Sequence, residues 1–445
     1  MGRRRSRKAR LAALPPVVAR IEGMAHDGRG VARVEGKTVF VDGALPGEEV
    51  EFAWVSRRRS FDEARTLRVL EATADRVEPR CPHFGVCGGC ALQHLAPEAQ
   101  VRFKQGVLLD NLQRLGGLTP DTVLPPLTGA PWGYRRKARL AVRYVRRKGR
   151  VLVGFRERHS PFVADMHVCP VLHPAVGERL DDLSRLVGGL ELRARIAQIE
   201  VAVSEGDAAL VFRNLDDAPE GDRLALAEFG RQHGLAIYLQ PGGPETVAPL
   251  WPPAPRLFYR LPRFELELGF LPTDFTQVNF GVNRAMVERA VTLMELDGGE
   301  RVLDLFCGIG NFSLPLARQA AAVTGVEGDR GLVERARDNA ARAGLENVRF
   351  EVADLTAPER PPGDGGAFAR VLLDPPRSGA LEALPMVAAT GARRIVYVAC
   401  HPGTLARDAG ELVRSHGYRL LAAGIMDMFP HTAHVESIAV FERSG

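Results

Sequence analysis

Short apolar segments alternate with segments of helical pattern from Arg301 to the C-terminus, and no other feature constrains the fold as strongly. The apolar segments, in chain order, are RVLDLF, AVTGVE, VRFEVA, RVLLDPP, RRIVYVAC and HVESIAVFER. This alternation predicts an α/β domain with a doubly wound, mostly parallel sheet. Folds of this class bind their ligands at the carboxyl ends of the strands. Functional residues are therefore expected where these apolar segments end.

The first apolar segment runs into a glycine-containing turn. Asp304 stands near its end, residues 308–311 (Gly-Ile-Gly-Asn) form a tight turn, and a helix is expected from about Phe312. Glycines there allow the backbone to approach a ligand closely. The turn lacks the third glycine of a dinucleotide fingerprint, and Glu327, ~20 residues further on, is suited to accept hydrogen bonds from ribose hydroxyls. Taken alone, the turn also fits a NAD-binding half-domain or a purely structural turn.

The residues at the ends of the third and fourth apolar segments help to distinguish these alternatives for the turn. Asp354 follows the third apolar segment, in VADL, and Asp374 ends the fourth, in VLLDPPR. The four strand ends together resemble the class I S-adenosylmethionine-dependent methyltransferases, a Rossmann-like fold. The resemblance implies that Asp354 lies near the adenine and that Asp374 lies near the reacting substrate.

The N-terminal part has a different pattern, with short strands separated by glycine turns from Val17 to about Leu70. Such a series predicts a small closed β-barrel. Residues 28–30 before Val31 and the segment ALPGEEVE resemble the TRAM domain, an OB-like RNA-binding barrel. Barrels of this class often bind single-stranded nucleic acid, although a structural support role is the alternative.

The chain is long enough for about three domains. We expect a basic tail over residues 1–14, the barrel over 15–72, a β-rich central domain over 73–268 and the catalytic domain over 269–445. Lysine and arginine outnumber aspartate and glutamate by 59 to 54, with the excess in arginine-rich runs, which suggests a polyanion partner unless these runs are ordinary solvated faces. No apolar stretch approaches the ~20 residues of a membrane span. A globular, soluble chain is expected.

Five motifs in and around the catalytic domain point to one family: TDFTQVN, LDLFCGIGNFSL, DPPRSG, VACHPGTLARD and HVESIAVF. Together they resemble the RNA uracil-5-methyltransferases and look closest to the bacterial 23S ribosomal RNA branch. With the barrel and a cysteine cluster, the resemblance covers essentially the whole chain. It implies an S-adenosylmethionine-dependent enzyme that methylates carbon 5 of a uridine in RNA.

The reaction explains why a nucleophile and a base are both needed. Carbon 5 of uracil is too weak a nucleophile to take a methyl group unaided. A thiolate that adds to carbon 6 gives carbon 5 carbanion character, and a base must later remove the carbon 5 proton before the thiol is expelled. The family match assigns Cys400 as the nucleophile and Glu436 as the proton acceptor.

The match also implies where the cofactor and the target uracil bind. Asp374 and Gln277 match positions that contact one or the other, and we count Phe306 and Asn311 with Glu327 and Asp354 among the cofactor-binding residues. Gln277 lies in TDFTQVN, and Phe306 opens the glycine-containing turn.

Cys400 directly follows the strand RRIVYVA and precedes Pro402. It should therefore lie exposed at the carboxyl end of the sheet, where a nucleophile is expected, although a lone cysteine can also be a buried structural residue. The family commonly has Ser-Cys-Asn-Pro here, whereas this chain has His401 in place of the asparagine. His401, His431 and His434 are interpreted as polar loop residues rather than as bases.

Six cysteines in 445 residues argue against a disulfide scaffold and favour a reducing cytoplasm. Cys81, Cys87 and Cys90, in CPHFGVCGGC, together with Cys169 make one set of four thiolates. The family match implies a [4Fe-4S] cluster, and structural zinc is the alternative. The spacing differs from that of radical-generating iron-sulfur enzymes, so a structural or RNA-orienting role is expected rather than a redox role.

Three other functions remain to be compared. A transfer RNA uridine methyltransferase is the nearest, but the bacterial transfer RNA branch lacks the cluster and the barrel. A non-catalytic RNA-binding or ribosome assembly protein would not need Cys400, Glu436 and Asp374. A DNA cytosine methyltransferase fits poorly because its nucleophile usually follows the fourth strand in a Pro-Cys motif. We expect 23S ribosomal RNA as partner, neither DNA nor membrane, and a monomeric chain.

Overall fold

The computed structural model describes residue 11, residues 14–357 and residues 367–443. The chain forms two compact units, of which the first contains residues 1–103, 156–162 and 430–434 and the second contains residues 104–155, 163–429 and 435–445. Most of the expected basic tail over residues 1–14 lies outside the described residues. The four-part division of the chain, with its boundaries near residues 15, 73 and 269, remains a prediction.

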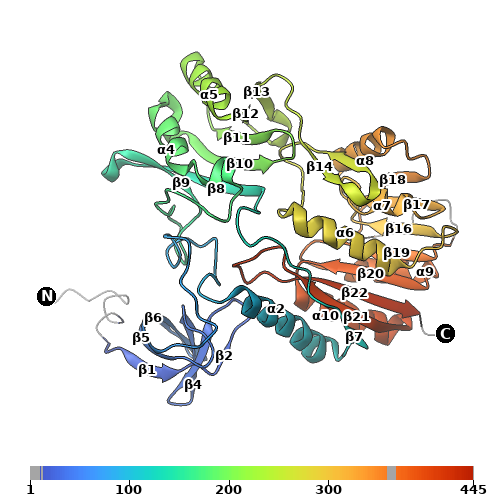
Figure 1. The fold of residues 1–445 in the computed structure, drawn as a ribbon, viewed down its shortest axis with the longest axis horizontal. Coiled ribbons are helices and arrows are strands. Elements are labelled where there is room, and N and C mark those ends of the chain that lie inside the picture. Colours follow the sequence, from blue (N-terminus) through green and yellow to red (C-terminus); the bar gives the residue numbers. More distant parts are fainter. Residues whose placement is uncertain (1–10, 12–13, 358–366, 444–445) are drawn as a thin grey trace. The chain divides into compact units, whose positions relative to one another are not determined.

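The first unit begins with a β-barrel, drawn in blue in Figure 1. Its six strands pair in the order β1-β5-β6-β4-β3-β2. They are β1 (Val17–Arg20), β2 (Gly23–Met24), β3 (Gly30–Val34), β4 (Lys37–Asp42), β5 (Glu49–Arg57) and β6 (Phe61–Glu71). The first and last strands of that order, β1 and β2, are separated by only two residues, so the sheet closes on itself. The barrel predicted over this segment is confirmed.

Alternation of side chains fills the barrel. In β4, Val39 and Val41 are fully buried while Phe40 between them is less so, and β5 buries Val50 and Phe52 in the same way. Successive residues of a strand point to opposite faces, so each strand gives one apolar face to the interior. The interior is completed by Ile21 and by small alanines.

The second unit contains two main sheets. One is a mixed sheet of order β13-β12-β11-β10-β8-β9. Its strands are β8 (Lys137–Val145), β9 (Arg150–Gly154), β10 (Ile196–Val203), β11 (Ala208–Asn214), β12 (Leu235–Leu239) and β13 (Ala248–Trp251). Two further strands, β14 (Phe258–Leu261) and β15 (Leu266–Gly269), form a hairpin. The strands of the mixed sheet are connected by three helices, α3 (Pro174–Gly177) and α4 (Leu180–Gly189) between β9 and β10 and α5 (Glu220–His233) between β11 and β12.

The other sheet has eight strands in the order β18-β17-β16-β19-β20-β22-β21-β7 (Figure 1). They are β7 (Thr122–Val123), β16 (Arg301–Leu305), β17 (Ala322–Glu327), β18 (Val348–Val352), β19 (Arg370–Leu373), β20 (Arg394–Ala399), β21 (Tyr418–Met426) and β22 (Glu436–Arg443). The connecting helices are α6 (Phe280–Met294), α7 (Ser313–Ala317), α8 (Arg330–Arg342), α9 (Leu384–Ala389) and α10 (Pro402–His416).

Five neighbouring strands of this sheet, from β18 to β20, run parallel, and β22 is antiparallel to both of its neighbours. The predicted doubly wound α/β fold is thus confirmed. From β16 the chain continues to β17 and β18 on one side of the sheet and then to β19 on the other side of β16. The strand order therefore reverses at β16. Ligands bind beside such a switch point, at the carboxyl ends of the strands.

A segment far from the catalytic region in sequence also belongs to this sheet. Strand β7 pairs in parallel with β21, and Leu124 and Leu127 continue the contact by donating backbone N–H groups to Ala423 and Ile425. Helix α2 (Pro97–Asn111) and the π-helical turn η1 (Leu112–Gly116) precede this strand. No local pattern predicts this eighth strand, because it is only two residues long.

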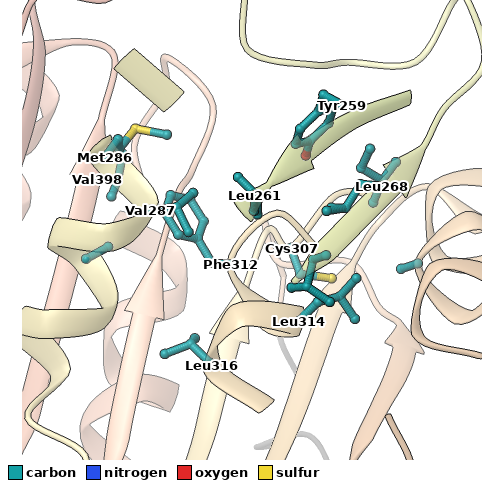
Figure 2. Packing of buried hydrophobic residues seen from close by; sticks show 14 of the residues in the cluster. Tyr259, Leu261, Leu268, Met286, Val287, Cys307, Phe312, Leu314, Leu316 and Val398 are labelled. Atoms are coloured by element: carbon teal, nitrogen blue, oxygen red, sulfur yellow. The ribbon is translucent and has the colours of Figure 1, made fainter. Parts of the chain in front are cut away.

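The core beneath the glycine-containing turn is shown in Figure 2. Cys307, Phe312 and Leu314 from the turn and α7 pack with residues of the β14–β15 hairpin and of α6. These side chains are almost completely excluded from solvent. Dense apolar packing of this kind holds the backbone of the turn in one position. No helix in the described part of the chain has the length and apolar character needed to cross a membrane.

Candidate active site

The carboxyl ends of β16, β17, β19 and β20 meet at one edge of the sheet. Leu305 of β16 pairs with Val326 of β17 and with Leu373 of β19, and Leu373 pairs with Tyr397 of β20. The residues that follow these positions are therefore brought together. They include Glu327, Asp374 and Cys400, which were all predicted as site residues.

The turn after β16 has the backbone conformation that its glycines suggest. Gly308 and Gly310 have φ values of 54° and 92°. A side chain at Gly310 would also come within 3.0 Å of Leu314. Phe306 adopts a φ of 64°, which is uncommon for a residue other than glycine. Backbone strain of this kind is concentrated at ligand-binding sites.

Glu327 joins two of the strand-end loops. Its carboxylate accepts backbone N–H groups of Gly308, at 3.1 Å, Gly328, at 2.8 Å, and Asp329, at 3.1 Å. A carboxylate can accept about four hydrogen bonds. Glu327 therefore keeps some capacity to accept ribose hydroxyls while it fixes the glycine-containing turn beside it.

Asn311 is held within the protein. Its Oδ1 accepts hydrogen bonds from the Tyr259 hydroxyl, at 2.8 Å, and from Asn283 Nδ2, at 3.0 Å, while its own Nδ2 donates to Asn283 Oδ1 at 3.0 Å. Burial raises the pKa of Tyr259, so its hydroxyl keeps the donated proton. The side chain of Asn311 thus anchors the turn to α6 and β14, and a contact with a cofactor would come from the turn's backbone.

The two remaining predicted cofactor residues lie on loops. Asp354 is exposed after β18, and its Oδ1 accepts the N–H and hydroxyl of Thr356 at 2.8 and 2.7 Å. Those hydrogen bonds lower the pKa of Asp354, so it is ionised at neutral pH. Gln277 is half-buried on the loop that leads into α6, two residues before Asn279, which caps that helix.

Cys400 directly follows β20, and Glu436 opens the adjacent strand β22. Ala399, the last residue of β20, pairs with Ser437 of β22, and Glu436 is the first residue of β22. Continuing this antiparallel register by one residue places Cys400 opposite Glu436. Side chains at opposite positions share one face of the sheet with Cβ atoms about 4.5–5.5 Å apart. The fold therefore brings the predicted nucleophile and the predicted base together.

Buried carboxyl groups give this site an unusual electrostatic character. Burial, followed by the neighbouring carboxyl groups of Glu436 and Glu327, raises the pKa of Asp374 to about 8. Burial also raises the pKa of Glu436 to about 7, although Lys104 and Arg377 lower it. Such shifts are concentrated at functional sites because the acids there are not paired for stability.

Asp304 extends the acidic group into the sheet. It is fully buried, its Oδ2 accepts the hydroxyl of Ser313, and its Oδ1 has no hydrogen-bond partner among the described residues. Burial raises the pKa of Asp304 to about 8, and the charges of Asp374 and Glu327 contribute in the same direction. An orphaned buried oxygen beside several acids fits a ligand that carries positive charge and hydrogen-bond donors, as S-adenosylmethionine does.

The thiol of Cys400 is affected by the same charges. Burial, then Glu436 and Asp374, raises its pKa to about 11, against the opposing effect of Arg377. Cys400 is half-buried rather than enclosed in the core. It is therefore a thiol at neutral pH and needs a proton acceptor before it can act as a nucleophile.

The residue after Cys400 has a local structural role. His401 is the N-cap of α10, and its Nδ1 accepts the backbone N–H of Thr404 at 3.2 Å. Asparagine is among the residues that most favour this position, because its side-chain oxygen accepts the same bond. His401 thus supplies the cap that an asparagine would supply, which gives a physical reason for the substitution.

Two charged residues near this site were not singled out from the sequence. Arg377 lies in the quoted DPPRSG motif, so its position was available. Lys104 lies on α2, far in the sequence from every catalytic motif, and only its fully buried position reveals it. The sole sequence signal was a charged residue within a helix that also buries apolar positions.

The four predicted cluster cysteines are divided between the two units. Cys81, Cys87 and Cys90 lie in the first unit and Cys169 lies in the second. The Sγ of Cys87 accepts the N–H of Gly89 at 3.3 Å, as a thiolate ligand would, and Cys81, Cys87 and Cys169 are buried. Within residues 11, 14–357 and 367–443, no group of three or more His, Cys, Asp or Glu side chains is arranged to hold a metal ion. The cluster remains a prediction.

Three protein-family models match the chain. Residues 17–52 match the TRAM domain, residues 296–360 match a methyltransferase domain, and residues 364–444 match tRNA (Uracil-5-)-methyltransferase. The TRAM match falls on the barrel, and the other two matches together cover most of the eight-stranded sheet and its strand-end loops.

Similar proteins extend over the full length. The chain is 60% identical to a 23S rRNA (uracil(1939)-C(5))-methyltransferase of Alkalilimnicola ehrlichii and 54% identical to one of Methylococcus capsulatus, each comparison covering 100% of both chains. Among solved structures, the tRNA (uracil-54, C5)-methyltransferase of Pyrococcus abyssi, in complex with S-adenosyl-L-homocysteine, has a TM-score of 0.73 at 23% identity. It covers 96% of this chain and 100% of that one, which shows that the fold is shared.

Proposed function

Because the chain belongs to the family of 23S rRNA (uracil-C5)-methyltransferases, we propose that it methylates carbon 5 of a uridine in 23S ribosomal RNA. The observation that carries this proposal is the pairing of Ala399 with Ser437 across β20 and β22, which brings the next residues, Cys400 and Glu436, close enough for Glu436 and Asp374 to raise the pKa of Cys400. A half-buried thiol next to a base with a pKa of about 7 meets the two chemical needs of the reaction.

The chain's residues act in a fixed order. The Cys400 thiol first loses its proton, which the neighbouring Asp374 carboxylate can accept, so that Glu436 stays free for the later step. The Cys400 thiolate then adds to carbon 6 of the uracil, so that carbon 5 gains carbanion character. S-adenosylmethionine, when bound, supplies the electrophilic methyl group. Glu436 removes the carbon 5 proton, the bond between carbon 6 and Sγ breaks, and the double bond of the uracil is restored.

The acidic group also suits the methyl donor. A sulfonium and an α-ammonium group add positive charge to the site, which would lower the pKa values of Asp374, Glu436 and Cys400 together. In this proposal Glu327 accepts the ribose hydroxyls and Asp354 lies at the adenine. The backbone around Phe306 and Asn311, with Gln277 and Asp374, completes the binding site for the cofactor and the uracil.

We further propose that Cys81, Cys87, Cys90 and Cys169 hold a [4Fe-4S] cluster. The donor set fits, because four thiolates complete the coordination of such a cluster and Cys87 accepts a backbone N–H. The cluster would supply structural support, with no part in the methyl transfer. Iron and acid-labile sulfide in the purified protein would support this assignment, and stoichiometric zinc without iron would replace it with the zinc alternative.

The remaining assignments follow from the RNA substrate. The barrel would bind single-stranded RNA, as OB-like barrels do. The expected site of action is the cytoplasm, where ribosomal RNA is made, and the expected state is a monomer that binds neither DNA nor membrane. The expected domains are the barrel over 15–72, the central domain over 73–268 and the catalytic domain over 269–445.

The product of the reaction tests the proposed function. Purified protein is incubated with labelled S-adenosylmethionine and either unmodified 23S ribosomal RNA or unmodified transfer RNA, and the digested nucleosides are identified by mass spectrometry. The proposal expects 5-methyluridine in the ribosomal RNA, and none with Cys400→Ala. Label only in transfer RNA would support the runner-up substrate, and methylation at any other atom would overturn the proposal.

A matched variant separates the catalytic thiol from a structural one. Cys307 is buried in the apolar core of Figure 2, and burial raises the pKa of its thiol well above the usual value. Cys307→Ala removes a thiol from the turn after β16 without touching Cys400. It should lower stability and still yield 5-methyluridine.

A further inference from the structure

A buried lysine pairs with an aspartate at the end of β21. Lys104 on α2 has no solvent exposure, and its Nζ donates to Asp427 Oδ1 at 2.6 Å and to the carbonyl oxygen of Phe429 at 2.8 Å. A buried ammonium is costly unless it is paired and hydrogen-bonded. Burial of the Lys104 ammonium therefore costs solvation free energy. An apolar side chain would pack here without that cost, which suggests that the charge has a function.

Strand register places this pair next to the proposed base. Asp427 directly follows Met426, the last residue of β21, and Met426 pairs with Glu436 of β22. The backbone N–H of Asp427 donates to Leu127 at 2.7 Å, which fixes the end of the strand. The ammonium of Lys104 is close enough to Glu436 for each charge to favour the ionised form of the other.

Burial opposes the ionisation of Glu436, and the two nearby cations Lys104 and Arg377 favour it. The groups that share its surroundings come from the ends of β19, β20 and β21 and from α2: Asp374, Arg377, Cys400, Asp427 and Lys104. Only two of them are cations, and Arg377 is exposed to solvent, where its effect is screened. Lys104 is thus the one fully buried cation that the described residues place beside Glu436.

We propose that Lys104 is a positioning residue that keeps the Glu436 carboxyl group ionised and therefore able to accept the carbon 5 proton. This inference rests on the proposed function, because it gives a purpose to the base in that reaction. Lys104 touches neither the uracil nor the methyl donor in this account. Its charge acts through Glu436, and Asp427 with the Phe429 carbonyl holds it in place.

The pH dependence of turnover tests this proposal. Glu436 must be deprotonated to act, so the rate should fall as the pH drops below the pKa of Glu436, which is about 7 in the free protein. Lys104→Met removes the favourable charge, so the acidic limb of the profile should move to higher pH by about one to three units. The rate of the variant should approach that of the original chain above the shifted limb.

Two further variants separate charge from structure. Lys104→Arg keeps the positive charge beside Glu436 and should therefore leave the acidic limb within about half a pH unit of its original position. If Lys104→Met fails to fold because Asp427 is left unpaired, Lys104→Met with Asp427→Asn removes both buried charges. That double variant should fold and shift the limb in the same direction, but by less than Lys104→Met, because it also removes the negative charge of Asp427.

A remote buried cation supplies the control. Arg394 opens β20 at the end of the strand opposite to Cys400, is 8% exposed, and pairs with Glu295 at 2.7 Å. Arg394→Met should lower stability without moving the acidic limb. If Lys104→Met lowers the rate equally at every pH and the acidic limb of its pH profile is not shifted, the proposal is overturned.

Trapping with 5-fluorouridine separates this proposal from the proposed function. Fluorine at carbon 5 cannot leave as a proton, so the RNA should remain bound to Cys400 without any action by the base. The proposal expects Lys104→Met to form this adduct to the same final yield as the original chain. If the original chain forms no adduct, the proposed function fails, whereas adduct formation with an unshifted limb overturns the role of Lys104 alone.

Discussion

Acidic side chains have opposite electrostatic surroundings in the barrel and in the eight-stranded sheet. In the barrel, Asp62 is ion-paired with Lys37 at 2.6 Å and with Arg57 at 3.2 Å, and despite the cost of burial these contacts lower its pKa. In the sheet, burial, and after it the neighbouring acids Glu436 and Glu327, raises the pKa of Asp374 to about 8.

This difference in surroundings separates acids that stabilise the folded state from acids that are available for the reaction. A paired carboxylate stabilises the folded state at neutral pH, whereas an acid buried among other acids destabilises it. The strand-end acids are tolerated because a cationic ligand and a proton transfer both need them. Predictions that separate the two regions therefore compare the same kind of substitution in each.

The largest effect is expected for Glu436→Gln. The amide cannot accept the carbon 5 proton, so turnover should fall by about 10²–10⁴-fold. The addition of Cys400 to carbon 6 precedes the removal of the carbon 5 proton and does not need Glu436. The methylated RNA should therefore accumulate as a covalent adduct of Cys400. Denaturing electrophoresis of the reaction with labelled RNA measures it. Unchanged turnover would remove Glu436 from the mechanism.

The same substitution in the barrel should affect stability instead. Glu48 is fully buried, and its carboxylate accepts two hydrogen bonds from Arg76, at 2.5 and 2.7 Å, and one from the N–H of Leu45. Glu48→Gln should lower the free energy of unfolding by about 3 kcal/mol, since Arg76 keeps some contact with water. Urea unfolding measures it.

The two glutamine variants control each other. Glu48→Gln protein that remains folded should still release 5-methyluridine, and Glu436→Gln should unfold at a urea concentration no lower than the original chain. A barrel variant that loses chemistry while folded would break the division between structural and catalytic acids.

A smaller effect is expected for Asp374→Asn. The folded-state pKa of Asp374 is raised from 3.8 to about 8, so its charge makes the fold less stable as pH rises through that window. The amide removes this penalty, and the free energy of unfolding at pH 8 should rise by about 1 kcal/mol or more. Urea unfolding between pH 5 and about pH 8 measures the change in slope.

The opposite sign is expected in the barrel. The lowered pKa of Asp62 stabilises the fold above the unfolded-state value and loses this contribution as pH falls. Asp62→Asn should therefore destabilise the chain at neutral pH and have little effect below about pH 3. An increase in stability at neutral pH would contradict the comparison.

The sequence was sufficient to predict the barrel and the sheet, because both follow from regular patterns. Period-two alternation such as that of Val39 and Val41 predicts a barrel strand, and the acids at strand ends predict the ligand edge. The roles of Cys400 and Glu436 were assigned only through the family resemblance, since the residues are 36 positions apart and the register of β22 is not encoded locally.

Lys104 and Asn311 show where sequence reasoning ends. The role of Lys104 depends on a contact with Asp427, 323 residues away, which no local pattern encodes. Asn311 was predicted to bind the cofactor because of its place in the turn, yet its side chain is engaged with Tyr259 and Asn283. Such tertiary hydrogen bonds depend on packing between distant segments.

The covalent role of Cys400 is the central claim, and 5-fluorouridine-containing 23S ribosomal RNA tests it most directly. After incubation with S-adenosylmethionine, protease digestion and mass spectrometry should find a peptide joined through Cys400 to a methylated 5-fluorouridine. A methylated RNA with no protein attached, or an RNA joined through a residue other than Cys400, would contradict the account.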